Sequence, residues 1–187
     1  KGQDVTPDRL RFDFSHFQKV SDEEIKAIEA MVNARIRENI ALEEDRAVPI
    51  EEAKKLGAMM LFGEKYGEFV RVITFDKNFS RELCGGTHVP ATGQIGQFKI
   101  VAESAVAAGI RRIEAVTAAG AEAYFVKEMA ELNAVRELLK NPQNLTAAVQ
   151  SLQEENRKLG KEIERLIAEQ AGALKGELMS KIEQAGG

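Results

Sequence analysis

The sequence contains no tryptophan, one cysteine and two histidines among 187 residues, and each shortage excludes something. A single cysteine excludes a disulfide framework within the chain and favours a cytoplasmic protein. Aromatic residues make up only 6% of the chain, so its core must be mostly aliphatic. A run of about 18 apolar residues, the minimum for a membrane-spanning helix, is also missing.

An excess of positive charge is missing too, since 26 Lys and Arg stand against 30 Asp and Glu, for a net charge of −4. This balance excludes a protein that coats nucleic acid, so any RNA contact must be local. Hydrophobic residues at 44% predict a folded chain rather than a disordered one. The chain begins Lys1-Gly2-Gln3-Asp4, without an initiator Met or a signal segment, so we expect a piece of a larger protein.

Alternating apolar residues predict four strands in residues 1–120. The first follows the turn residues Thr6-Pro7-Asp8 and has Leu10, Phe12 and Phe14 on its apolar side. The four expected strands are residues 9–17, 69–75, 97–102 and 110–117. In the first of them one face is apolar and the other polar, which is typical of antiparallel sheets.

Two helices are expected between the first and second of these strands. Ser21 and Glu24 form a capping box, and apolar residues then recur at helical spacing to about Arg46. Pro49 suits the first turn of a shorter helix that ends at Gly57. The expected fold class is therefore α+β, a mostly antiparallel sheet with packed helices, followed by a long helical or coiled-coil segment.

The β pattern stops after Gly120. We expect a connecting helix over residues 121–142, ended by Asn141-Pro142, and a heptad helix over residues 143–187. The apolar seam of the heptad helix consists of Leu145, Val149, Leu152, Asn156, Leu159, Ile163 and Leu166. An asparagine on such a seam often fixes register, so we expect self-association. An amphipathic helix lying on its own domain fits the same pattern.

Cys84 and His88 are the one pair of residues with clear chemical content. Thiolate and imidazole are both zinc ligands, and a spacing of four residues is common for ligand pairs. Gly85 and Gly86 argue against a helix between them, so a tight loop must turn both side chains to one point. Two ligands do not close a zinc site. There are two alternatives to a zinc site: the spacing is accidental, or the pair belongs to a hydrolase with Cys84 as nucleophile and His88 as base.

His16, Arg111 and Arg112 are weaker candidates. His16 lies on the apolar side of its strand, which favours a core or rim histidine over a third metal ligand. Adjacent strand residues point to opposite faces, so one arginine can contact phosphate while the other pairs with Glu103 or Glu114. Ordinary surface cations fit the arginines equally well.

The segment Arg-Glu-Leu-Cys-Gly-Gly-Thr-His-Val at residues 81–89 resembles the second metal motif of the alanyl-tRNA synthetase editing domain. Residues 10–17, 57–67, 92–96 and 109–115 resemble that family as well. These segments together cover about residues 1–125 in the family's order. The heptad tail is similar to the helical start of the family's carboxy-terminal oligomerisation region.

The resemblance implies a function. The family's aminoacylation domain, missing here, uses ATP and magnesium to charge tRNA(Ala), and its editing domain hydrolyses Ser- or Gly-tRNA(Ala). Zinc is held there by an HxxxH and a CxxxH pair, which makes Cys84 and His88 two metal ligands. The HxxxH pair is absent from this sequence. We therefore expect residues 1–120 to be a partial editing domain with an incomplete zinc site, inactive by itself.

The resemblance names no catalytic residue in this chain. We expect the 3′ end of the tRNA to meet Gly85, Gly86, Thr87, Arg111 and Arg112. The alternative function is a coiled-coil assembly module with a non-catalytic α+β head.

Overall fold

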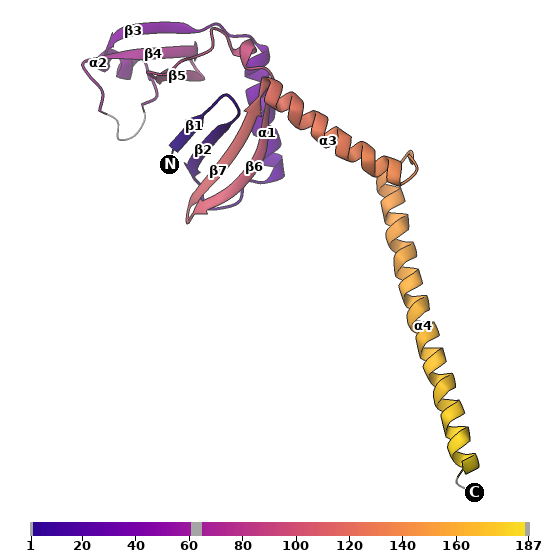
Figure 1. Cartoon of the computed structure of the whole chain (residues 1–187). Helices are drawn as coiled ribbons and strands as arrows, with labels where there is room; N and C mark the ends of the chain where they lie inside the picture. The colour runs from indigo at the N-terminus through magenta and orange to yellow at the C-terminus, as the bar shows by residue number, and fades with distance from the viewer. Residues whose placement is uncertain (1, 61–64, 186–187) are drawn as a thin grey trace. The chain divides into compact units, whose positions relative to one another are not determined.

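The computed structural model describes residues 2–60 and 65–185 (Figure 1). Its elements, in chain order, are β1 (Gly2–Val5), β2 (Leu10–Ser15), α1 (Asp22–Arg37), β3 (Glu43–Pro49), α2 (Ile50–Lys55), β4 (Phe69–Asp76), β5 (Ser80–Leu83), the 3-10 helix η1 (Thr92–Ile95), β6 (Phe98–Ala107), β7 (Ile110–Thr117), α3 (Ala118–Leu138) and α4 (Leu145–Ala185). The chain divides into two compact units, residues 1–126 and residues 127–187.

Two antiparallel sheets form within the described part of the first unit. One is four-stranded with the order β1-β2-β7-β6, and the other is three-stranded with the order β3-β4-β5 (Figure 1). The α+β class expected from the sequence, with antiparallel sheets and packed helices, is therefore confirmed. Within the described residues, no helix is long and apolar enough to cross a membrane.

The four-stranded sheet buries its apolar face under α1. Ala115 on β7 is fully buried and pairs with Leu10 on one side and Ile100 on the other. Ile25 and Ile28 of α1 pack against this centre. Burying each such side chain contributes about 1.5–3 kcal/mol, so this contact holds the helix on the sheet.

Side chains of α1 also pair with the backbone of β6, which is an edge strand. Asn33 Oδ1 accepts from the Phe98 N–H at 2.8 Å, and Asn33 Nδ2 donates to the Phe98 carbonyl at 2.8 Å. Glu29 Oε1 accepts from the Ile100 N–H at 2.8 Å, and its carboxylate pairs with Lys99 at 2.9 Å. The helix thus takes the place of a neighbouring strand along the first three residues of β6 and closes that part of the edge to other chains.

The expectation that the first helix reaches about Arg46 is wrong. Helix α1 ends at Arg37, and Asn39 then adopts a positive φ of 50°, which a helix cannot continue through. Thr92 Oγ1 donates to the Arg35 carbonyl at 2.9 Å and accepts from the Ile40 N–H at 2.8 Å. The hydroxyl thus provides hydrogen bonds for backbone groups that lose their helical partners at the carboxyl end of α1. The following residues form β3, because they find a partner strand in β4.

The short helix α2 covers one face of the three-stranded sheet. Its Ala53 is fully buried and joins Val70, Val72 and Leu83 of β4 and β5 in a second core. Gly57 has a φ of 72° just after this helix, as expected for a residue that ends it. Of residues 57–67, which carried part of the family resemblance, residues 61–64 lie outside the described residues.

In the second unit, α4 begins at Leu145 and Asn144 is its cap. The Asn144 Oδ1 accepts from the Ala147 N–H at 2.9 Å, which replaces an intrahelical partner missing at a helix start. On the expected seam, Leu145 and Val149 are half-buried and Asn156 is exposed. The side chains of Leu152, Leu159, Ile163 and Leu166 are 45–57% exposed.

Replacing Asn33 by leucine is expected to destabilise the first unit by about 1–3 kcal/mol, because the Phe98 N–H and carbonyl both lose their partner. Urea unfolding followed by circular dichroism measures the change. Asn133→Leu is the matched control, since it makes the same change at an exposed position of α3. Equal effects of the two substitutions would contradict the edge-closing function of Asn33.

Candidate metal centre

The two faces of the three-stranded sheet carry different side chains. Val72 and Leu83 pair across β4 and β5, and both lie in the apolar core. The neighbouring pair, Ile73 and Glu82, must face the other way because successive strand side chains alternate. Cys84, two residues after Glu82, continues on this second face. The alternation therefore gathers Glu82 and Cys84 on the face opposite Val72 and Leu83, where the neighbouring Ile73 is buried.

Arg71 holds the backbone of the loop that follows β5. Its Nη1 donates to the Cys84 carbonyl at 3.0 Å and also to the Gly86 carbonyl. The Cys84 N–H in turn donates to the Arg71 carbonyl at 3.3 Å. Arg71 Nε donates to Glu44 on β3 at 2.7 Å, so the guanidinium connects β3 and β4 with the loop that follows β5. This network fixes the path of the chain at Cys84.

The Glu44 carboxylate stays charged beside Arg71. Hydrogen bonds from Arg71 and then from Arg46 hold the pKa of the Glu44 carboxyl below its usual value, against a smaller opposing effect of burial. The Arg71–Glu44 pair therefore persists at neutral and mildly acidic pH.

The loop after β5 brings three potential metal ligands together. A carboxylate oxygen of Glu82, the Sγ of Cys84 and an imidazole nitrogen of His88 all lie within 4.8 Å of one another. All three residues are half-buried. The ring of Phe75 lies beside the His88 ring, with 6.3 Å between the ring centroids. No other cluster of this kind occurs among the residues that the structure describes.

The donor set fits a zinc ion. Thiolate, imidazole and carboxylate are all zinc ligands. His88 Nε2 is buried and has no hydrogen-bond partner within the described parts of the chain, a state that costs free energy unless a ligand relieves it. The Gly86 N–H donates to Cys84 Sγ at 3.4 Å, so the loop backbone also supports the sulfur atom.

The structure brings some of the sequence candidates together and leaves others apart. Cys84 and His88 converge, and Gly85, Gly86 and Thr87 form the exposed part of the same loop. His16 is exposed just after β2 and is not part of the cluster, so it is no core histidine. Glu82 was missed. Its signal in the sequence was the two-residue spacing to Cys84, which places both residues on one face of a strand.

Arg111 and Arg112 are both engaged within the four-stranded sheet. Arg111 makes two bonds of 2.5 Å to the Glu103 carboxylate, and Arg112 makes bonds of 2.7 and 2.9 Å to Asp13. Their side chains are 15% and 29% exposed. Bidentate pairs of this kind are strong and hold guanidinium groups in place. A phosphate contact by either arginine stays a prediction.

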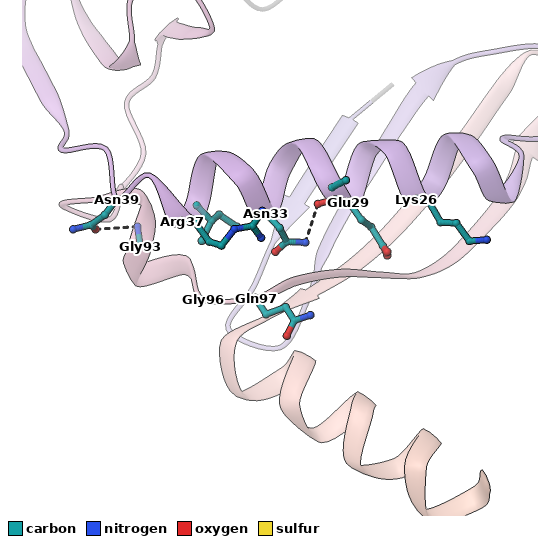
Figure 2. Close-up of a pocket in the computed structure, with 10 residues that line it drawn as sticks. Lys26, Glu29, Asn33, Arg37, Asn39, Gly93, Gly96 and Gln97 are labelled. Atoms are coloured by element: carbon teal, nitrogen blue, oxygen red, sulfur yellow. Dashed lines mark hydrogen bonds between the residues drawn. The ribbon is translucent and has the colours of Figure 1, made fainter. Parts of the chain in front are cut away.

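A groove of about 690 Å³ runs along α1 and past η1 (Figure 2). Two of its polar side chains, Glu29 and Asn33, already bond the backbone of β6. Asn39 Oδ1 accepts from the Gly93 N–H at 3.2 Å, and a Cβ on Gly93 would lie only 2.4 Å from that oxygen (Figure 2). Glu29, Asn33 and Asn39 therefore serve the attachment of α1 and η1, and the candidate site is the donor cluster on the other sheet.

Comparisons with known proteins cover the same region. A family model described as "Threonyl and Alanyl tRNA synthetase second additional domain" matches residues 70–114, which include all three donors. The chain is 56% identical over 186 residues to the alanine–tRNA ligase of Cytophaga hutchinsonii. It is 51% identical over 187 residues to those of Parabacteroides distasonis and Flavobacterium psychrophilum. Each alignment covers 100% of this chain and 21% of the relative, so the chain spans about a fifth of their length.

The Asp13–Arg112 pair predicts a pH dependence of stability. A hydrogen bond from Arg112 is the largest cause that lowers the pKa of Asp13 in the folded chain. The pair therefore stabilises the fold above the unfolded pKa of about 3.9, and this contribution is lost as the pH falls through the lower folded pKa.

Asp13→Asn is expected to be less stable than the unchanged chain at pH 6, with a smaller further loss of stability at pH 3. Urea unfolding at the two pH values measures both differences. Asp8→Asn serves as control, since Asp8 is exposed and makes no ion pair among the described residues. If the stability of Asp13→Asn fell between pH 6 and pH 3 as much as that of the unchanged chain, the Asp13–Arg112 pair would not be the cause of this pH dependence.

Proposed function

Because the chain belongs to the alanine–tRNA ligase family, we propose that residues 1–126 form part of the editing module of such an enzyme. In the whole protein this module hydrolyses tRNA(Ala) esterified with serine or glycine. The observation that carries the proposal is the convergence of Cys84 with His88, whose buried Nε2 atom has no hydrogen-bond partner among the described residues. The match of residues 70–114 to a synthetase additional domain supports it.

A separate hydrolytic site is needed because the pocket that selects alanine for charging has limited specificity. A pocket built for alanine cannot strongly reject glycine, which only lacks a methyl group, or serine, which only adds a hydroxyl. Differences of this size in a binding pocket are worth about 1–3 kcal/mol. The charging reaction, which uses ATP and magnesium, belongs to a part of the whole protein outside these residues.

The side chains of this cluster have distinct tasks in the proposal. Cys84 and His88 hold the metal ion, and Arg71 keeps their loop in place from behind. Bound zinc supplies a Lewis acid that can polarise the ester or orient the aminoacyl group. The exposed Gly85, Gly86 and Thr87 present backbone to the 3′ end of the tRNA.

The proposal gives this chain part of the ligand set only. The family pattern contains a second pair of histidines in an HxxxH motif, and the two histidines of this sequence, His16 and His88, do not form one. We therefore propose that another segment of the whole protein supplies that pair. On this view the 187-residue chain by itself neither charges tRNA nor edits.

In the whole enzyme, Cys84→Ser is expected to slow deacylation of Ser-tRNA(Ala) by about 100-fold or more, because loss of a ligand costs more than loss of a supporting contact. Charging with alanine is expected to stay unchanged. His16→Ala is the control, since that histidine lies outside the cluster. Undiminished deacylation by the Cys84 variant would overturn the proposed metal function.

We propose a second function for α4, namely self-association with a second copy of the chain. The helix has 41 residues, and four of its seam residues are 45–57% exposed. Exposed apolar side chains at heptad spacing are buried when two helices pair. Asn156 on this seam favours one register, because an unmatched asparagine would be buried without a partner.

Leu159→Glu is expected to weaken self-association at least tenfold, because it places a charge in the seam. Ala168→Glu is the matched control: it adds the same charge at an exposed position of the same helix, five residues after Ile163 and away from the seam. Sedimentation velocity over a range of concentrations distinguishes the two. An unchanged chain that stays monomeric at every concentration would contradict this proposal.

A further inference from the structure

We propose that the groove along α1 and η1 binds the sugar–phosphate backbone of a tRNA, with Lys26 and Arg37 as the side chains that contact its phosphates. The inference rests on the proposed function, which makes a tRNA the substrate of this unit. It goes beyond that function because the groove shares no residue with the donor cluster or with the loop of residues 85–87.

One side of α1 lines the groove. Its residues recur at intervals of four, three and four positions, which places them on one side of a helix: Lys26, Ala30, Asn33 and Arg37. Lys26 and Arg37 are the outer two (Figure 2), and the helix between them spans about 16 Å. Successive stacked nucleotides are about 3.4 Å apart. This side of α1 is therefore long enough for a few nucleotides and has a cation at each end.

Lys26 and Arg37 are exposed cations that the fold itself does not use. Neither makes an ion pair or a side-chain hydrogen bond with a residue in the described ranges, whereas Arg35 on the same helix pairs with two carboxylates. Among the described residues that line the groove, Glu29 alone is acidic, and Lys99 balances its charge at 2.9 Å. The groove is thus locally positive in a chain with a net charge of −4, as a local RNA contact requires.

The wall opposite α1 is neutral and small. Gln97 lies across from the helix (Figure 2), and its exposed side-chain amide has no hydrogen-bond partner among the described residues. An amide N–H donates to a phosphate oxygen without adding charge. Gly93 and Gly96 on the same wall have no side chains that would fill the groove. A sugar–phosphate chain therefore finds room, two cations and a neutral donor.

The hydrogen-bond acceptors of the groove favour a nucleic acid over an acidic peptide. Glu29, Asn33 and Asn39 each already accept from a backbone N–H of this chain. A peptide strand would bring further N–H donors that need acceptors. Phosphate oxygens are acceptors only, so a phosphate backbone needs the donors that the groove has left, which are those of Lys26, Arg37 and Gln97.

The groove and the donor cluster are close along the chain. Five residues lead from His88 to Gly93, and a segment of that length spans at most about 18 Å. Within it, Ala91 forms an antiparallel bridge with Ala41, so the segment is attached to the residues that follow α1. One tRNA is therefore able to hold phosphates in the groove while its 3′ end reaches the donor cluster.

Binding of tRNA(Ala) without an amino acid to the 187-residue chain tests the inference, measured by fluorescence anisotropy over a range of salt concentrations. The double variant Lys26→Gln/Arg37→Gln is expected to bind at least tenfold more weakly. Its plot of log K against log salt is expected to be less steep by about 1.4–1.8, because two fewer phosphates release their counterions. Glutamine has nearly the same helix propensity as lysine and arginine, so α1 is retained.

Lys158→Gln/Lys161→Gln is the matched control, because it removes the same two charges at exposed positions of α4 outside the seam. It is expected to bind like the unchanged chain. Equal affinities of the groove variant and the unchanged chain would overturn the inference, as would equal losses in the groove variant and the control. Absence of binding by the unchanged chain would overturn it as well.

Poly-glutamate is the second probe. If it displaces tRNA at an equal concentration of charge, and the groove variant no longer binds it, the groove takes acidic peptides and the RNA assignment is wrong. A tRNA without an amino acid has no ester to hydrolyse, so this test is independent of the metal centre. Deacylation by the whole enzyme together with unchanged tRNA binding by the groove variant would reject this inference alone, and tRNA binding without deacylation would reject the proposed function alone.

Discussion

The candidate site depends on one interaction, the contact of the Arg71 guanidinium with the two ends of the Cys84–Gly86 turn. A turn with two glycines would otherwise sample many backbone conformations, since glycine has the greatest freedom of any residue. Arg71 bonds the carbonyls of both Cys84 and Gly86 and is itself held by Glu44 from β3. The direction of the Cys84 side chain is thus set by Arg71 of β4 and, through Arg71, by Glu44 of β3.

The same type of constraint connects the rest of the first unit. Arg35, near the end of α1, pairs with Asp76 at 3.5 Å and stacks on the ring of Phe79, with 4.8 Å from its guanidinium carbon to the ring centroid. The Thr92 hydroxyl bonds the Arg35 carbonyl from η1. The end of α1 therefore contacts both the β4–β5 hairpin and the segment that leads into β6. Side-chain contacts of this kind compensate for the small apolar core of the three-stranded sheet.

Patterns that depend on near neighbours in the sequence predicted much of this fold. The capping box at Ser21 forms as expected, and β7 spans the expected residues 110–117. The end of α1 was missed because Asn39 and Thr92 act together across 53 positions of sequence. Strand β5, Ser-Arg-Glu-Leu, was missed because three of its four residues are polar. It is a strand because β4 pairs with it, and pairing with a distant strand has no signature within the segment itself.

For the site as well, the sequence predicted the residues that are close together in the chain and missed those that depend on strand pairing. The Cys84–His88 pair could be chosen from spacing and ligand chemistry, whereas Arg71 and Glu82 required the register of β4 with β5. That register also shows how the site differs from a zinc finger, which orders only when metal binds. Here the strands, the bonds of Arg71 and the apolar core under Leu83 order the donor cluster from within the fold. Little conformational entropy is left to lose, so under the proposed function the metal affinity of this cluster would report the donors themselves and not the folding of the chain.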